Sequence, residues 1–120
     1  AKAYEETRAY LQGNPVPDVV YCENDNMCFG VMQALDERGI AYGTGGVTLI
    51  TFDAVRTALS YCRDGKIDLC AECNPLHGPR VRAIIEQLER GETPEKQSYV
   101  PEQLFTAGQI TDELLESRVY

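Results

Sequence analysis

Apolar residues along the middle of the chain follow two different periods in turn. Short continuous apolar runs cover residues 19–22, 47–52 and 67–71, as in strands that are covered on both faces. The segments after these runs carry apolar residues at helical spacing. This alternation predicts an α/β fold in which right-handed crossovers join parallel strands and helices flank both faces of the sheet.

Glycine and proline mark where the predicted helices end. In the last long helix, Ile85 is expected on a buried face because Val81, Ile84 and Leu88 share its helical spacing. Residues 97–100 suit a short strand, and Thr111 suits the N-cap of a terminal helix. The predicted helices cover residues 2–12, 27–39, 55–64, 81–88 and 111–117.

Composition limits the classes of protein that fit. A chain of 120 residues with 43% hydrophobic and 25% charged residues fits one globular domain, and its apolar runs are too short to cross a bilayer. The formal net charge is −8 and no Lys/Arg-rich stretch is present, so nucleic acid is not an expected partner. Five cysteines, an odd number, argue against a disulfide framework. With no secretory leader at its start, the chain by itself suggests a reducing compartment.

Oxygen-bearing side chains follow each predicted strand. Asn24 and Asp25 follow the first, Asp53 follows the second, and Glu72 and Asn74 follow the third. Because the carboxyl ends of parallel strands meet at one edge of a sheet, we expect these turns to converge where open α/β sheets hold ligands. Carboxylates and amides with few cations nearby suit a neutral ligand rich in hydroxyl groups. A simpler interpretation is that the Asn-Asp turn and Asp53 cap the helices that follow.

Other chemistry has weaker support. Cys70 and Cys73 form a Cys-x-x-Cys near His77, but side chains three apart in a strand point to opposite faces, so we do not expect a zinc site. The cysteines are interpreted as small apolar core residues. Residues 43–46 precede a strand rather than open a helix, so this glycine-rich segment is interpreted as a flexible connector. No catalytic residue, metal or cofactor is predicted.

Four segments in a fixed order resemble a known family. They are Pro-Asp-Val-Val-Tyr-Cys-Glu-Asn-Asp-Asn-Met-Cys-Phe-Gly-Val-Met-Gln-Ala-Leu, Phe-Asp-Ala, Asp-Gly-Lys-Ile and Glu-Cys-Asn-Pro-Leu-His-Gly-Pro. Together they are similar to the C-terminal part of bacterial periplasmic sugar-binding proteins, the substrate-binding components of ABC importers of the ribose/galactose type. Residues 91–96 and the final Tyr120 most resemble the galactofuranose-binding branch. The resemblance extends over residues 14–120.

The resemblance implies a periplasmic-binding-protein type I fold, in which two α/β lobes close over a sugar. The whole chain would be one fragment of such a protein. Residues 1–73 would belong to the C-terminal lobe, residues 74–110 would cross to the N-terminal lobe, and residues 111–120 would form a terminal helix. Most of the other lobe, with its aromatic stacking residues and arginine clamp, would lie outside this chain. Surfaces left uncovered would favour self-association.

The resemblance also implies a function for the oxygen-bearing turns. Asn24 and Asp25 match an Asn-Asp turn that binds sugar hydroxyls, Asp53 matches a second acceptor, and Glu72 and Asn74 match polar residues where the chain crosses between lobes. The expected activity is binding of a monosaccharide without catalysis. Its expected partner is a membrane permease, and its expected location is extracytoplasmic, in the periplasm or lipid-anchored at the cell surface.

Two other functions remain open. The same architecture occurs as the effector-sensing domain of lactose-repressor type transcription regulators, although residues 64–67 and 73–75 look more like transport proteins. From a different class, a small flavodoxin-like enzyme would use Asp25 and Asp53 to hold a divalent metal.

Overall fold

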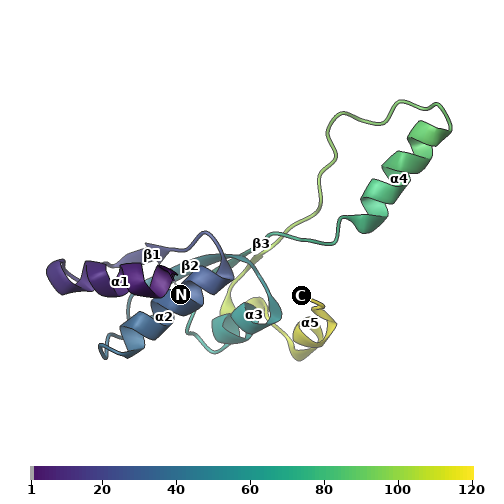
Figure 1. The fold of residues 1–120 in the computed structure, drawn as a ribbon. Coiled ribbons are helices and arrows are strands. Elements are labelled where there is room, and N and C mark those ends of the chain that lie inside the picture. Colours follow the sequence, from purple (N-terminus) through teal and green to yellow (C-terminus); the bar gives the residue numbers. More distant parts are fainter. Residues whose placement is uncertain (1) are drawn as a thin grey trace.

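The structure is a computed structural model that describes residues 2–120, and it consists of a body and a long arm (Figure 1). The body holds most of the helices and the whole sheet, and the arm projects from the end of β3. In chain order the elements are α1 (Lys2–Gly13), β1 (Val19–Tyr21), α2 (Asp25–Asp36), β2 (Thr48–Asp53), α3 (Arg56–Arg63), β3 (Leu69–Glu72), α4 (Gly78–Glu89), β4 (Leu104–Phe105), the 3-10 helix η1 (Ala107–Gln109) and α5 (Asp112–Ser117).

The sheet has the order β1-β2-β3-β4. β1, β2 and β3 are parallel, as the alternation of strands and helices predicted, so the α/β fold class is confirmed. β4 runs antiparallel to β3, so the sheet is mixed and the prediction of a wholly parallel sheet is wrong. The strand expected at residues 97–100 is also wrong, because this segment lies in the arm, where the described residues offer it no neighbouring strand.

The core lies between the sheet and the helices of the body. Leu49, Thr51 and Cys70 alternate along β2 and β3 and are fully buried beneath α2 and α3. Val19 and Tyr21 on β1 point to the opposite face of the sheet and are exposed. Within residues 2–120, this face is therefore less covered than the face that carries Leu49, Thr51 and Cys70.

Four of the five cysteines are buried in this core, as their interpretation as apolar residues predicted, and Cys73 is exposed. A hydrogen bond with Cys22 and burial raise the pKa of the Cys28 thiol. The thiols of Cys62 and Cys70 interact in the same way, and the pKa of Cys70 is raised. Protonated thiols behave as small apolar groups, which suits them to this core.

The helix ends follow the predicted signals. The Asn24 side chain accepts a hydrogen bond from the Met27 N–H at 2.8 Å and caps α2. Gly39, with φ of 64°, allows the chain to leave α2 in the left-handed conformation. Thr111 caps α5 through the Leu114 N–H at 3.2 Å. These three local predictions are confirmed.

The arm contains α4, and no residue of α4 is buried. The radius of gyration is 18.2 Å, whereas a compact chain of this length has about 14 Å. Ile85 is 50% exposed, so its expected burial is wrong for this chain. The apolar spacing predicted the helix, but the partner for its apolar face is not within the described residues (Figure 1).

The glycine-rich connector is held by backbone hydrogen bonds and is closely packed at Gly43, which corrects its interpretation as a flexible segment. Thr44 N–H donates to the Gly65 carbonyl at 2.9 Å, and Gly43 N–H donates to the Val47 carbonyl at 2.8 Å. A Cβ added at Gly43 would lie 2.1 Å from the Gly65 oxygen, and the φ of Gly43 is 70°. Only glycine satisfies both constraints without moving the backbone.

We therefore expect Gly43→Ala to lower the free energy of unfolding by about 2–5 kcal/mol, from left-handed strain and the backbone clash combined. Gly45→Ala is the matched control, because Gly45 also has a positive φ, 90°, but has open space around its Cβ position. Gly45→Ala should lower the free energy of unfolding by only about 1–2 kcal/mol. Urea unfolding followed by circular dichroism measures both. Equal losses for the two variants would contradict the clash at Gly43.

Candidate functional site

The carboxyl ends of β1, β2 and β3 bring the predicted oxygen-bearing turns to one edge of the sheet. Asp53 and Glu72 end neighbouring parallel strands and are direct partners in the register. Asp25, at the start of α2, is hydrogen-bonded to Thr51 of β2, so the first turn lies beside the second. The expected convergence of these turns is therefore present in the structure.

Asn24 is partly buried, and its Oδ1 is occupied in capping α2. Its Nδ2 donates no hydrogen bond within the described part of the chain, so this side chain has a donor left for a ligand. Capping and ligand contact are compatible here because they use different atoms of the same amide.

Asp25 is 1% exposed, and both of its carboxylate oxygens are bonded within the protein. Oδ1 accepts from the Thr51 hydroxyl at 2.8 Å, and Oδ2 accepts from the Val55 N–H at 2.8 Å. Burial raises the pKa of this carboxyl, although the hydrogen bonds from Val55 and Thr51 oppose the shift. The Asp25 side chain therefore joins α2 to the end of β2 and the start of α3.

Asp53 is partly exposed and its carboxylate accepts no hydrogen bond from residues 2–120. Its φ is 99° and that of Ala54 is 58°, and among the described residues these two are the non-glycine residues with positive φ. Asp53 does not cap α3, whose N-cap is Val55. The simpler interpretation of Asp53 as a helix cap is therefore wrong, and its acceptor oxygens remain free.

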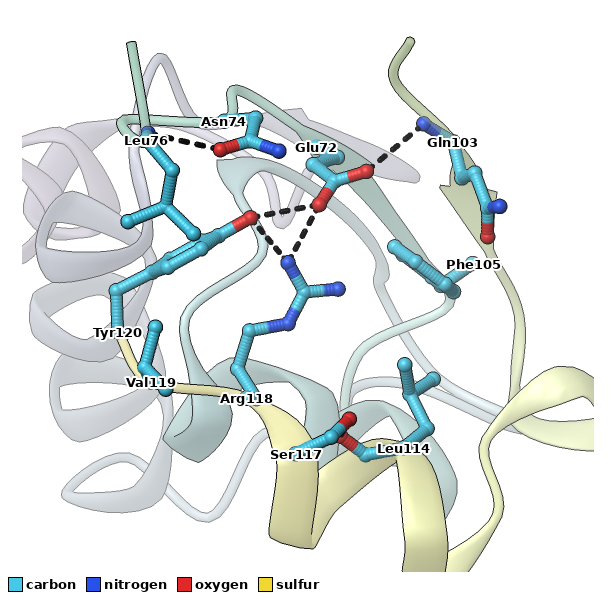
Figure 2. A pocket seen from close by; sticks show the side chains of 10 residues that line it. All are labelled: Glu72, Asn74, Leu76, Gln103, Phe105, Leu114, Ser117, Arg118, Val119 and Tyr120. Carbon is cyan, nitrogen blue, oxygen red and sulfur yellow. Dashed lines mark hydrogen bonds and ion pairs between the residues drawn. The ribbon is translucent and has the colours of Figure 1, made fainter. Parts of the chain in front are cut away.

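Glu72 lies in a hydrogen-bonded cluster with the C-terminal tail (Figure 2). Its Oε1 accepts from the Arg118 guanidinium at 2.5 Å and from the Tyr120 hydroxyl at 2.6 Å, and its Oε2 accepts from the Gln103 N–H at 3.1 Å. The Glu72 and Arg118 side chains are 9% and 7% exposed. Burial alone would raise the pKa of Glu72, but hydrogen bonds from Tyr120 and Arg118 outweigh it and lower that pKa.

Asn74 lies beside this cluster and also lines a cavity of about 270 Å³ (Figure 2). Its Oδ1 accepts from the Leu76 N–H at 2.8 Å, which fixes the side chain, and its Nδ2 donates no hydrogen bond within residues 2–120. The cavity is lined by Glu72, Asn74, Leu76, Gln103, Phe105, Leu114, Ser117, Arg118, Val119 and Tyr120. Asn24, Asp25 and Asp53 do not line it.

Arg118 and Tyr120 are the members of this region that sequence reasoning missed. The sequence suggested few cations near the acidic turns, but the fold brings Arg118 onto Glu72 from 46 positions away, which corrects that expectation. The Arg56 N–H and side chain hold the same tail by donating to the carbonyls of Tyr120 and Arg118. No local motif in the last three residues signals this contact.

Within residues 2–120 there is no group of three or more histidine, cysteine or acidic side chains arranged to hold a metal ion. The described helices include none that is both long enough and apolar enough to span a membrane. Chemically, the edge of the sheet offers free amide donors at Asn24 and Asn74 and a free carboxylate acceptor at Asp53, a set that matches hydroxyl groups.

Comparison with known proteins agrees with this chemistry. A family model described as a periplasmic binding protein domain matches residues 1–77. The fructose import binding protein FruE of Bifidobacterium longum is 30% identical over 98 residues, which cover 82% of this chain and 29% of that protein. This chain therefore spans less than a third of the length of that relative.

Solved structures share the fold. A protein from Mycobacterium smegmatis in complex with β-D-fucofuranose is 28% identical and has a TM-score of 0.81. The match covers 89% of this chain and 35% of the Mycobacterium smegmatis chain. A galactofuranose binding protein is 24% identical and has a TM-score of 0.81. The match covers 98% of this chain and 40% of the galactofuranose binding protein. These matches confirm the resemblance to periplasmic sugar-binding proteins. The chain belongs to the periplasmic binding protein family.

Proposed function

We propose that this chain forms one wall of the sugar site in the solute-binding component of an ABC importer. The protein would bind a monosaccharide between two lobes without catalysis, outside the cytoplasm, and deliver it to a membrane permease. The observation that supports this most directly is the set of free polar groups on adjacent strand ends: the Asp53 carboxylate and the Nδ2 atoms of Asn24 and Asn74.

The proposed roles follow from which atoms are still free. The Asp53 carboxylate accepts from sugar hydroxyls, a charge-assisted bond that is stronger than a neutral one. Asn24 and Asn74 donate to hydroxyl oxygens, because the Oδ1 of each is held by a backbone N–H. Donors and acceptors fixed in this way suit a ligand whose hydroxyl groups both donate and accept. Similar proteins bind or are named for fructose, fucofuranose, galactofuranose and L-arabinofuranose, which supports a sugar as the ligand class.

Glu72 has a different proposed role, because both of its carboxylate oxygens already accept hydrogen bonds from the protein. It bonds the C-terminal tail and residue 103, where the arm returns to the body. In this proposal it supports the wall beside Asn74 and fixes the base of the arm rather than binding sugar.

The arm supports the proposed division into lobes. Residues 2–73 form the body together with residues 104–120, and residues 74–103 project from it (Figure 1). We propose that residues 74–103 cross to the N-terminal lobe, a shorter segment than residues 74–110, because β4 pairs with β3 in the body. The apolar residues on this arm would then be covered by that lobe. They are Leu76, Val81, Ile85, Leu88 and Tyr99.

A sugar screen on a longer form of the protein that contains both lobes tests the proposal. We expect D-fructose, L-arabinose or D-galactose to raise the melting temperature, because a ligand that binds only the folded state stabilises it. Asp53→Ala should weaken the affinity by about 1.5–3 kcal/mol, the typical contribution of a hydrogen bond to a charged group. Isothermal calorimetry measures this loss.

Asp64→Ala is the matched control, because Asp64 lies after the C-terminal end of α3, on the side of the sheet away from Asp53. Its affinity should equal that of the unaltered protein. The proposal fails if no monosaccharide stabilises the longer protein, and the role of Asp53 fails if its variant binds as tightly as the Asp64 control.

Glu72→Gln tests the supporting cluster. We expect a loss of about 1–3 kcal/mol in the free energy of unfolding at pH 7, because a charged acceptor in a buried cluster is replaced. The lowered pKa of Glu72 stabilises the folded state above the unfolded pKa of about 4.3, and this contribution disappears as the pH falls through the folded value. The stability difference between the two proteins should therefore shrink below about pH 4.3 and disappear once the pH is below the folded pKa of Glu72.

Urea unfolding at pH 3 to 7 measures that convergence, with the exposed Glu89→Gln as control. A stability difference that stays constant across this range would contradict the ionic role of Glu72.

Ile85→Ala tests where the arm packs. In the 120-residue chain it should change the free energy of unfolding by less than about 0.5 kcal/mol, because the side chain is half exposed. In the longer protein the same change should cost about 2–5 kcal/mol, the usual cost of a cavity in a core. Parallel denaturant titrations of both lengths make the comparison. A small loss in both lengths would mean that the other lobe does not cover this face.

A further inference from the structure

The turn that presents Asp53 is strained and needs support from its surroundings. Asp53 and Ala54 both have positive φ although neither is glycine. Such residues cost roughly 1–3 kcal/mol each and persist only where neighbouring structure fixes them. Ala54 is fully buried, so the turn also has no room to relax into solvent.

Asp25 bonds the chain on both sides of this turn. Thr51, two residues before Asp53, donates to one carboxylate oxygen, and Val55, two residues after it, donates to the other. Both distances are 2.8 Å. The single side chain therefore bridges the two ends of the strained segment.

The bond to Val55 also satisfies a free backbone donor at the start of α3, as the N3 side chain does in a capping box. Val55 is the N-cap residue of α3 and has no side-chain cap of its own. A negative group near the first turn of a helix is favourable because of the helix dipole. Asp25 supplies that charge to α3 from the start of α2.

Asp25 itself offers no surface to a ligand, since it is 1% exposed. Its position beside the other polar turns made it a candidate for sugar contact, but both oxygens already face protein donors. A buried carboxylate is tolerated only when hydrogen bonds satisfy it, and these two bonds do so.

We propose that Asp25 is a positioning residue: its buried carboxylate clamps Thr51 and Val55 and thereby holds the strained Asp53–Ala54 turn in the conformation that presents Asp53. This assignment rests on the proposed function for its link to sugar affinity. Under this proposal, Asn24, Asp53 and Asn74 contact the ligand. Asp25 affects binding only by holding Asp53 in place.

Three substitutions separate positioning from direct contact. Asp25→Ala removes both bonds, and Thr51→Val removes one of them while it preserves the shape of the side chain. Asp25→Asn keeps both contacts, because its oxygen accepts from Val55 and its amide group donates to the Thr51 hydroxyl. Burial raises the pKa of Asp25, so Asp25→Asn removes the desolvation cost of the charge but also its attraction to the α3 dipole, and its stability at pH 7 should stay close to that of the unaltered protein.

The first measurement needs no ligand. Amide hydrogen exchange of the 120-residue chain should be faster at residues 53–56 in Thr51→Val and at least ten-fold faster there in Asp25→Ala, and unchanged in Asp25→Asn. If Asp25→Ala does not fold, Thr51→Val decides the outcome alone. Unchanged exchange at residues 53–56 in the variants that lose a bond would overturn the clamp.

The second measurement is a double-mutant cycle in the longer protein, with D-fructose, L-arabinose and D-galactose as probes. Asp25→Ala should raise Kd at least ten-fold when Asp53 is present and by less than two-fold in an Asp53→Ala background. Asp25→Asn should stay within about three-fold of the unaltered protein. Additive losses at Asp25 and Asp53 would overturn the positioning role, and so would a large loss in Asp25→Asn.

The two measurements separate the possible failures. If no monosaccharide in the screen binds the unaltered longer protein, the proposed function fails, and the exchange experiment still decides whether Asp25 supports the turn. If a sugar binds and the exchange rates do not change, the clamp fails while the proposed function stands.

Discussion

The parallel pairing of β2 with β3 is the interaction on which the rest of this structure depends. The register places Asp53 opposite Glu72 at the ends of the two strands. The chain makes its main departures from the sheet at these strand ends: into the strained turn after Asp53 and into the arm after Glu72. If one strand shifted by one residue in this register, its side chains would turn to the opposite face, and Asp53 and Glu72 would no longer lie side by side.

In the proposed site, the internal bonding of each polar group at the strand ends separates supporting residues from ligand-binding residues. Both carboxylate oxygens of Asp25 and of Glu72 accept hydrogen bonds from protein donors, so these side chains join backbone segments that are distant in the sequence. Asp53 and Asn74 keep free atoms next to these groups. Side chains that are fixed by internal hydrogen bonds can support neighbouring side chains whose polar atoms are free. A binding site built in this way keeps its geometry before the ligand binds.

Local signals in the sequence predicted the elements of the body because their causes are local. The apolar runs predicted β1, β2 and β3, and Asn24, Gly39 and Thr111 predicted helix ends through short-range hydrogen bonds and backbone preferences. The convergence of the polar turns also followed, since parallel strands align their carboxyl ends.

The failed predictions depend on distant contacts. The antiparallel β4, the exposure of Ile85 and the approach of Arg118 to Glu72 are set by residues far away in the chain, and apolar spacing carries no information about them. The burial of Asp25 was missed for the same reason, because a carboxylate near a helix start has the same sequence signature whether it faces solvent or Thr51.

The paired base of the arm has a mechanical consequence. Glu72 N–H donates to the Gln103 carbonyl at 2.8 Å, and Gln103 N–H donates to the Glu72 side chain at 3.1 Å, so the outgoing and returning segments leave the body tied together. The arm is therefore fixed to the body at a paired point near Glu72. Because α4 lies at the far end of the arm, a small change of angle at this base would displace α4 by a much larger distance.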